Sequence, residues 1–448
     1  MAQSKIKYLI IGNSAGGIGA AEAIRAVDSK SPITIVSDEP YPVYSRPQIS
    51  EHLATGHPLE KMLFRPADFY DRNNITTILG KKVARLDVGK HTIELENGEH
   101  LVWGKLLLAT GGLPIVPRME GSQRKGVFTF TTLDDAKAID QFLKQSPQEK
   151  LKAVVIGGGL IGVSVTEALV KRGVAVTIIE MRERILNVLL DEAASALAHE
   201  TLRQIGVEII TGHTVSKING SSDSKPTGVT LDDGQVLPCA LVIVAIGVLP
   251  RTELAAGAGI KVNRGIVVDR HMATSSPDVY ACGDVAESYD FVYGENRLAP
   301  IWPNAYLGGR IAGLNIAGVP TEYQGGTAMN SMKYFGLSIV SAGMVNPPDD
   351  SYEVLSHHHK GSYHKVIVKD GIVVGMVFAG NIEQSGIVLS LMRDKVNVAD
   401  FKQVLVAEDF GFIALPEKIW RPRLEVPPSA TVIASAAVEP AEKEVAGD

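Results

Sequence analysis

The sequence predicts an α/β protein that contains two similar strand–helix–strand units and a smaller α+β domain toward its C-terminus. Many of its 44 glycines end short runs of β-branched residues, as in IIGNSAGG and VVIGGG, where a buried parallel strand passes into a helix. The order strand, glycine turn, helix, strand occurs over residues 7–36 and again over 153–180, each close to the length of one βαβ unit. After residue 352 apolar and polar residues alternate, and Asp370-Gly371 between two such runs predicts a β-hairpin.

Length and composition narrow the class of protein. The 448 residues suffice for about three domains, and a net charge of −6 argues against nucleic acid as a partner. Cys239 and Cys282 form neither a disulfide framework nor a zinc-binding pair, so we predict no metal site and a reducing, cytoplasmic environment. The longest apolar run, 241–249, is shorter than the roughly 20 residues of a membrane span, and we predict no membrane association.

The second strand–helix–strand unit carries a complete dinucleotide-binding pattern. Gly157, Gly159 and Gly162 follow a strand and open a helix, and the next strand ends in Glu180. The first glycine makes a tight turn, the second lets the backbone approach a pyrophosphate, and the third lets helix and strand pack closely. The phosphates would then face the positive N-terminus of the helix.

The end of the following strand predicts which nicotinamide cofactor binds. The Glu180 carboxylate can accept hydrogen bonds from both ribose hydroxyls of an adenosine, and it would repel a 2′-phosphate. Arg182 and Arg184 stand close by and keep NADPH open as an alternative. We therefore predict NADH as the preferred cofactor, with NADPH less favoured.

The first unit is less regular than the second. Gly12 and Gly17 hold the first and third glycine positions, but Ser14 occupies the second. Ser14 either donates a hydrogen bond to a phosphate oxygen or is merely tolerated there. Asp38 and Glu39 follow the second strand of this unit and are the candidate ribose-binding acids, with a solvated loop as the alternative.

Further segments resemble one family. LLLATGG at 106–112, LVIVAIGVLPRTELA at 241–255 and GIVVDRHMATSSPDVYACGDVAE at 265–287 are similar to segments of the pyridine nucleotide-disulfide oxidoreductase superfamily of flavoproteins. The resemblance implies two Rossmann-like dinucleotide-binding domains, one for FAD and one for NAD, together with a C-terminal α+β domain. The implied domains are FAD-binding (1–116 and 245–325), NAD-binding (117–244), a C-terminal α+β interface domain (326–424) and a disordered tail (425–448).

The resemblance also implies residues that bind FAD. Gly283 and Asp284 would hold the ribityl and pyrophosphate part, because glycine admits the flavin chain and an aspartate at a strand end accepts protons from hydroxyl groups. Trp302 and Ala305 would approach the pyrimidine end of the flavin, with a core aromatic as the alternative for Trp302. Further implied cofactor-binding residues are Ala109, Thr110, Gly111 and Gly247.

One segment indicates the branch of the superfamily. Residues 38–53 contain no cysteine, although the disulfide-reducing members carry a redox cysteine there or in the NAD domain. YSRP at 44–47 resembles the YxRP segment of rubredoxin and ferredoxin reductases and of the nitrite reductase flavin domain, which implies that Arg46 and Pro47 lie along the flavin. Glu51 and Ser164 depart from the lysine and glutamate that many of those relatives have near the flavin and nicotinamide rings.

The resemblance implies an FAD-dependent NADH oxidoreductase that passes hydride from NADH to FAD, then electrons to a protein acceptor such as rubredoxin or ferredoxin. No side-chain acid or base is required, so we predict no catalytic residue. One alternative is a flavin subunit of a larger metalloenzyme that exchanges electrons with an iron–sulfur subunit. The others are an NADH oxidase and a redox-responsive binding protein. Both a homodimer and a hetero-oligomer are compatible with the sequence.

A few polar residues have two interpretations. Lys333 and Lys365 either attract an acidic electron carrier or are ordinary solvated lysines. His357, His358 and His359 are consecutive, so they cannot all face one ion, and we expect them in a polar loop before the hairpin.

Overall fold

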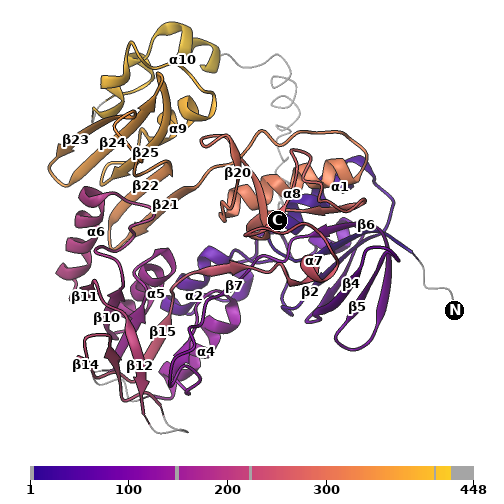
Figure 1. Ribbon diagram of the computed structural model, residues 1–448, viewed down its shortest axis with the longest axis horizontal. Helices are drawn as coiled ribbons and strands as arrows, with labels where there is room; N and C mark the ends of the chain where they lie inside the picture. The colour runs from indigo at the N-terminus through magenta and orange to yellow at the C-terminus, as the bar shows by residue number, and fades with distance from the viewer. Residues whose placement is uncertain (1–4, 147–150, 221–224, 408–409, 425–448) are drawn as a thin grey trace, which may run out of the picture.

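The computed structural model describes residues 5–146, 151–220, 225–407 and 410–424, so the predicted disordered tail lies outside the described residues. Figure 1 shows three domains, each built around a sheet. The first is formed by the N-terminal part of the chain and by a later segment that includes β18 (Val279–Ala281) and α8 (Trp302–Ile316). The second lies below the third in this view, and both lie beside the first. The predicted α/β fold with an additional sheet domain is confirmed.

The first domain contains the first predicted βαβ unit. In spatial order its sheet consists of β3 (Ile75–Leu79), β2 (Ile33–Ser37), β1 (Ile6–Ile11), β6 (His100–Leu108), β5 (Thr92–Leu95) and β4 (Val83–Asp87), with β18 (Val279–Ala281) beside the end of β6. Strands β1, β2, β3, β6 and β18 pair in parallel, while β4 and β5 run antiparallel. Every residue of β2 is buried, as expected for a parallel strand covered on both faces.

Two glycine-rich helices of this domain lie side by side, α1 (Ala15–Val27) and α8 (Trp302–Ile316) (Figure 1). A Cβ atom on Gly19 would lie 2.4 Å from the carbonyl oxygen of Tyr306, and one on Gly309 would lie 2.0 Å from that of Gly16. The two helices therefore approach backbone to backbone, a contact that only glycine permits. This contact holds the start of α8 against the first glycine turn.

The second domain contains the second βαβ unit in an all-parallel sheet. In spatial order the strands are β11 (Glu208–Thr211), β10 (Ala175–Glu180), β9 (Lys152–Ile156), β15 (Leu241–Val244) and β8 (Val127–Phe128). The surrounding elements are α4 (Leu133–Lys144), α5 (Leu160–Lys171), α6 (Glu192–Gln204) and a small antiparallel sheet of β12 (Val215–Asn219), β13 (Gly228–Leu231) and β14 (Val236–Leu237). The chain enters and leaves this domain through β7 (Gly112–Pro114) and β16 (Val248–Pro250), which pair antiparallel.

The third domain is a five-stranded antiparallel sheet with helices on one face. Its strands, in spatial order, are β21 (Met329–Tyr334), β22 (Leu337–Gly343), β25 (Ile372–Ala379), β24 (Ser362–Lys369) and β23 (Glu353–His359), followed in the chain by α9 (Ser385–Arg393) and α10 (Glu417–Leu424). The predicted hairpin is confirmed: Asp370 and Gly371, with φ of 50° and 77°, join β24 to β25. The predicted histidine loop is wrong, because His357–His359 pair with β24 and form the end of edge strand β23.

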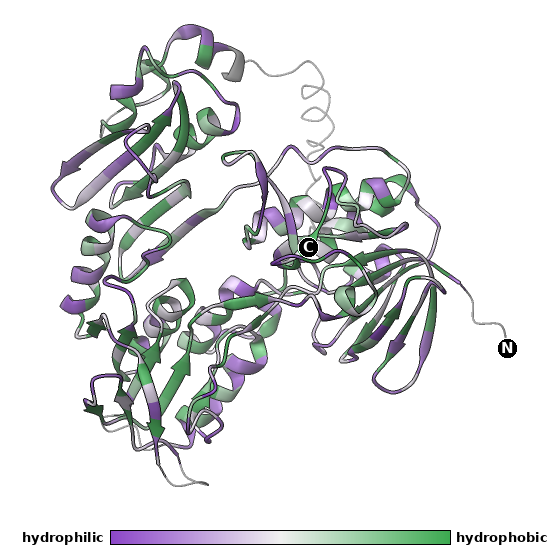
Figure 2. Ribbon diagram, viewed as in Figure 1, coloured by the Kyte–Doolittle hydropathy of each residue, from purple (hydrophilic) through white to green (hydrophobic). Residues whose placement is uncertain are grey.

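One hydrophobic core, which we call the shared core, extends through the second and third domains. It joins Leu169 and Ile243 of the second domain to Tyr334 and Val377 of the third, and it includes Leu53 from the short helix α2 (Ile49–Thr55) of the first. Figure 2 shows the apolar residues concentrated in the strands of these two sheets. The second and third domains are thus packed through a common apolar interior rather than through a solvated interface.

A buried ion pair accompanies the shared core. Lys365 on β24 is 6% exposed, and its Nζ lies 2.9 Å from Oδ2 of Asp191, which caps α6. The same ammonium donates a hydrogen bond to the Val345 carbonyl at 3.1 Å, and the Tyr363 hydroxyl donates to Asp191 at 2.6 Å. Both interpretations of Lys365 are therefore wrong, because this lysine links the second and third domains inside the protein and faces neither solvent nor a carrier.

None of the helices in the described part of the chain combines the length and the apolar character that crossing a bilayer requires. The first domain also contains several short elements. They are α3 (Phe69–Arg72), α7 (Glu253–Gly257), β17 (Ile266–Val267), β19 (Ala286–Asp290) and β20 (Glu295–Arg297).

Candidate functional site

One continuous cavity of about 2190 Å³ is lined by residues from all three domains. Its walls include both glycine turns, the start of α5 and the edge strand β21. The predicted site residues that line it are Gly12, Ser14, Asp38, Glu39, Arg46, Pro47, Ala109, Thr110, Gly111, Gly157, Gly159, Glu180, Gly247, Gly283, Asp284, Trp302 and Ala305. Gly17 and Gly162 are not among the lining residues.

The position of these two glycines agrees with a packing role. A Cβ on Gly17 would lie 2.0 Å from the Gly12 carbonyl oxygen, and a Cβ on Gly162 would lie 1.9 Å from that of Gly157. A side chain at Gly17 would therefore push α1 away from the turn that follows β1, and one at Gly162 would push α5 away from the turn that follows β9. At Gly159, in contrast, a Cβ would meet no protein atom within 4 Å, so this turn leaves open space in front of the N-terminus of α5. That space suits a pyrophosphate.

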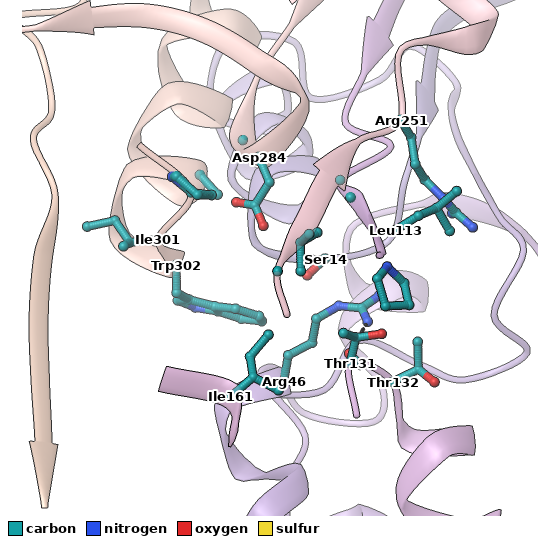
Figure 3. A pocket seen from close by; sticks show the side chains of 18 of the residues that line it. Ser14, Arg46, Leu113, Thr131, Thr132, Ile161, Arg251, Asp284, Ile301 and Trp302 are labelled. Atoms are coloured by element: carbon teal, nitrogen blue, oxygen red, sulfur yellow. Dashed lines mark hydrogen bonds between the residues drawn. The ribbon is translucent and has the colours of Figure 1, made fainter. Parts of the chain in front are cut away.

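Ser14 occupies the corresponding place at the N-terminus of α1. It is the N-cap residue, with an extended backbone, and its hydroxyl makes no capping hydrogen bond to the helix. Figure 3 shows the side chains of Ser14, Arg46 and Asp284 around the same pocket. The Ser14 hydroxyl is thus available to a ligand, which favours the first of its two predicted roles.

Asp284 is the carboxylate best placed to bind a ligand in this pocket. It follows β18 in a short turn whose first residue, Gly283, has a φ of 75°. Within the described residues no hydrogen-bond donor or ion-pair partner contacts its carboxylate, and burial raises the pKa of Asp284 despite the opposing effect of Arg46. A carboxylate that lines a cavity without a protein partner has its acceptor capacity free for a ligand. The hydroxyl groups of a ribityl chain can donate hydrogen bonds to it, so the residues present fit FAD.

The two candidate ribose-binding acids of the first unit already have protein partners. Both carboxylate oxygens of Glu39 are engaged, one by the Arg46 guanidinium and the other by the Tyr44 hydroxyl at 2.6 Å. Within the described part of the chain, Asp38 makes an ion pair through Oδ2 alone, with Arg251 at 2.7 Å. Asp38 therefore retains a free oxygen for a ribose, whereas Glu39 orients Arg46. Sequence reasoning did not single out Arg251, although this residue lies within the 241–255 segment that resembles the superfamily.

Arg46 is held rigidly at the cavity wall. Besides its ion pair with Glu39, its Nη1 donates to the Thr131 carbonyl oxygen at 3.0 Å. Burial alone would lower the pKa of Arg46, but the Glu39 carboxylate raises it above its usual value. The guanidinium therefore stays charged beside the position of a bound anion.

Glu180 stands at the end of β10 and is 9% exposed. Its two carboxylate oxygens accept hydrogen bonds from the backbone N–H groups of Gly158 and Arg182, each at 2.8 Å. The side chain is thereby fixed at the cavity wall with lone pairs left for ribose hydroxyls. Arg182 lines the same cavity, whereas Arg184 lines a separate small pocket beside Lys365. Of these two arginines, Arg182 is therefore the one placed to meet a 2′-phosphate.

Trp302, the first residue of α8, lies in the pocket of Figure 3 together with Ile161 and Arg46. Its ring packs edge-on against Phe64, with 5.1 Å between centroids. Ala305, one turn further along α8, lies under Gly283, where an added Cβ would approach it to 3.3 Å. The start of α8 therefore forms one wall of the cavity.

Glu51 and Ser164, the two positions at which this chain departs from the resembling reductases, lie in different environments. Glu51 is not among the cavity-lining residues, because it forms an ion pair with Lys171 at 3.7 Å and so links α2 to α5. Lys171 also pairs with Glu167 at 3.4 Å. Ser164 lines the cavity itself. At these two positions, therefore, the described cavity wall has neither the lysine nor the glutamate of the resembling reductases, and only the Ser164 hydroxyl faces the cavity.

Neither cysteine can supply a redox thiol. Cys282 is fully buried beneath Gly16, and burial raises the pKa of its thiol to about 12. Burial raises the pKa of the Cys239 thiol equally. Both groups therefore stay protonated at neutral pH, and a protonated thiol is a poor nucleophile.

Comparisons with known proteins agree with this geometry. The family described as pyridine nucleotide-disulphide oxidoreductase matches residues 6–309, and the rubredoxin NAD+ reductase C-terminal domain matches residues 329–396. The NADH-dependent phenylglyoxylate dehydrogenase subunit epsilon of Aromatoleum evansii is 32% identical over 90% of this chain and 94% of its own. The rubredoxin-NAD(+) reductase of Pseudomonas putida is 32% identical over 70% of this chain and 80% of its own.

Two further similarities concern proteins that act with partners. The assimilatory nitrate reductase electron transfer subunit of Bacillus subtilis is 31% identical over 91% of this chain, which spans only 52% of that relative. The covalent putidaredoxin reductase–putidaredoxin complex contains a chain that is 26% identical, with a TM-score of 0.83, over 94% of this chain and 99% of that one. The extent of these matches, together with two glycine turns on one cavity, shows that this chain belongs to the pyridine nucleotide-disulphide oxidoreductase family.

Proposed function

We propose that this chain transfers electrons between NADH and a protein redox partner by way of FAD. The observation that carries the proposal is the single cavity that joins both dinucleotide-binding turns, with unpaired Asp284 at one of them and Glu180 at the other. Bound FAD would take two electrons from NADH and release them one at a time. The protein binds the two cofactors, aligns them and keeps water from the space between them. Rubredoxin, ferredoxin or an iron–sulfur subunit is the proposed partner.

An anaerobic titration of the FAD-loaded protein tests this function before any partner is known. We expect NADH to bleach the visible flavin absorbance, and NADPH to do so only at much higher concentration because of Glu180. A flavin that stays oxidised in excess NADH would contradict the proposed direction of electron flow. It would instead favour a protein that receives its electrons from the partner.

A second candidate function is that of a flavin subunit within a larger enzyme complex. The similarity to the phenylglyoxylate dehydrogenase subunit, which covers nearly the whole of both chains, favours it. A tagged chain expressed from its native locus should then purify with untagged iron–sulfur subunits. An NADH oxidase is less favoured, because both thiols are buried and protonated. Oxygen uptake matching NADH consumption would reverse that preference.

We also propose that the protein works in the cytoplasm. Both cysteines are free thiols. Cys282 remains a thiol even though it lies beside the cavity in which the redox cofactors would bind. Free thiols persist in a reducing compartment. Fractionation of cells that express the native protein is the direct test, and recovery in another compartment would contradict this location.

A Glu180→Ala variant is expected to bind NAD+ at least about tenfold more weakly, because the ribose hydroxyls lose a charged acceptor. FAD should remain bound, and the preference for NADH over NADPH should fall, since Arg182 is no longer balanced by a neighbouring carboxylate. Calorimetric dissociation constants for NAD+ and NADP+ measure both effects. Glu183→Ala is the matched control, because Glu183 is exposed and does not line the cavity. Equal NAD+ affinity in the two variants would argue against the assigned role.

A further inference from the structure

One face of α5 runs along the cavity beyond the glycine turn. Leu160, Ile161, Ser164 and Glu167 line the cavity, and their spacing of three and four residues places them on the same side of the helix. Ile161 lies in the pocket together with Arg46 and Trp302 (Figure 3). Ser164, one turn further along, is therefore next to the place where a nicotinamide would extend from the pyrophosphate toward the flavin end.

The third domain reaches this face through Tyr334. This residue ends the edge strand β21, is 8% exposed and lines the cavity. Its hydroxyl donates a hydrogen bond to the Leu160 carbonyl oxygen at 3.4 Å, in the first turn of α5. Burial raises the pKa of Tyr334, so the phenol stays protonated, and a side-chain hydrogen bond with Ser164 opposes that rise. Because the single Tyr334 proton is directed at the Leu160 carbonyl oxygen, the Ser164 hydroxyl is the donor in its hydrogen bond with Tyr334.

The carboxylate on the same face is engaged through one of its two oxygens. Oε1 of Glu167 accepts a hydrogen bond from the backbone N–H of Phe335 at 3.3 Å, and it pairs with Lys171 at 3.4 Å. Ser164 lies one turn closer to the glycine turn than Glu167 does, so its hydroxyl oxygen is the nearer acceptor for a ring that extends from the pyrophosphate. A hydroxyl whose own proton is already donated can act toward a ligand only as an acceptor.

We propose that Tyr334 is a positioning residue that orients the Ser164 hydroxyl, so that its oxygen accepts a hydrogen bond from the carboxamide N–H of nicotinamide. This inference rests on the proposed function, because it assumes that a nicotinamide dinucleotide occupies the cavity. The third domain then contributes directly to recognition of the reacting ring. Ser164 stands where many of the resembling reductases have a glutamate, and Tyr334 is its neutral partner.

The test compares NAD+ with ADP-ribose, which lacks the nicotinamide, by calorimetry on the FAD-loaded protein. Tyr334→Phe should weaken NAD+ binding by about fivefold, the effect of one net hydrogen bond, and leave ADP-ribose binding unchanged. Ser164→Ala should likewise weaken NAD+ binding by about fivefold and leave ADP-ribose binding unchanged. The double variant should bind NAD+ no more weakly than either single variant, because both substitutions remove the same hydrogen bond. Tyr363→Phe is the matched control: it removes a hydroxyl from the same domain contact, away from the cavity, and should alter neither affinity.

Two results would overturn this inference. One is an NAD+ affinity that is the same in the wild type and in Tyr334→Phe. The other is an equal loss of NAD+ and ADP-ribose affinity, which would mean that the substitution damages α5 as a whole. If the wild-type protein bound neither ligand, the proposed function itself would fail, and the inference with it.

Discussion

An Asp284→Ala variant is expected to lose most of its FAD during purification. The Asp284 carboxylate lies in the cavity with no described protein partner, so its hydrogen-bonding capacity is reserved for the ligand. A hydrogen bond to a charged group contributes about 1.5–3 kcal/mol, and its loss should lower FAD affinity by about ten- to a hundredfold. The backbone should be little disturbed, because the fold makes no use of this side chain.

The ratio of flavin to protein after purification measures the effect. Asp284→Asn keeps an oxygen acceptor without the charge and should retain an intermediate amount of FAD. Binding of NAD+ by the Asp284→Ala protein provides the control for folding, since Glu180 and Gly159 lie at the other dinucleotide turn. Full flavin occupancy in Asp284→Ala would show that FAD does not depend on this carboxylate.

Replacing Asp191 with alanine is expected to lower the free energy of unfolding by about 3–5 kcal/mol, because it leaves the Lys365 ammonium buried without its counter-charge. The helix α6 also loses its cap, which adds to the loss. Urea unfolding at neutral pH measures the change. An Asp191→Ala, Lys365→Met double variant should recover much of the stability, since it removes the unpaired charge. A single variant as stable as the wild type would contradict the importance of this pair.

The same pair predicts how stability depends on pH. Burial alone would raise the pKa of the Asp191 carboxyl, but hydrogen bonds from Tyr363, Lys365 and the Ala194 N–H hold it below its usual value. A lowered pKa in the folded state stabilises the protein fully above the unfolded value of about 3.9. This contribution is lost as the pH falls through the folded pKa. The wild type should therefore lose more stability on acidification than the double variant does.

Local sequence patterns were sufficient to predict the two βαβ units and the β24–β25 hairpin. Each depends on residues close together in the chain, such as the glycines of 157–162 or the Asp370-Gly371 turn. The strand position of His357–His359 could not be predicted in this way, because it results from pairing with β24. The burial of Lys365 could not be foreseen either, since its counter-ion, Asp191, comes from a different domain.

The cavity wall shows the same division. Motifs that combine several positions were sufficient to identify cavity-lining residues of the two glycine turns, together with Glu180 and Asp284. The engagement of Glu39 by Arg46 and Tyr44 could not be predicted in this way, because it arises from side chains that converge only after folding. The close contact of α1 with α8 did leave a signal that sequence reasoning overlooked: both helices carry small residues at repeated positions.

The shared core also bears on how such proteins diversify. A gene truncated before residue 329 would encode a second domain whose apolar surface had lost the cover of Tyr334 and Val377, and its product should aggregate. The C-terminal domain is therefore not a detachable module that recombination can exchange at no cost. Descendants of this chain would acquire new electron partners more readily through substitutions at surface positions, while the boundary between these two domains stayed intact.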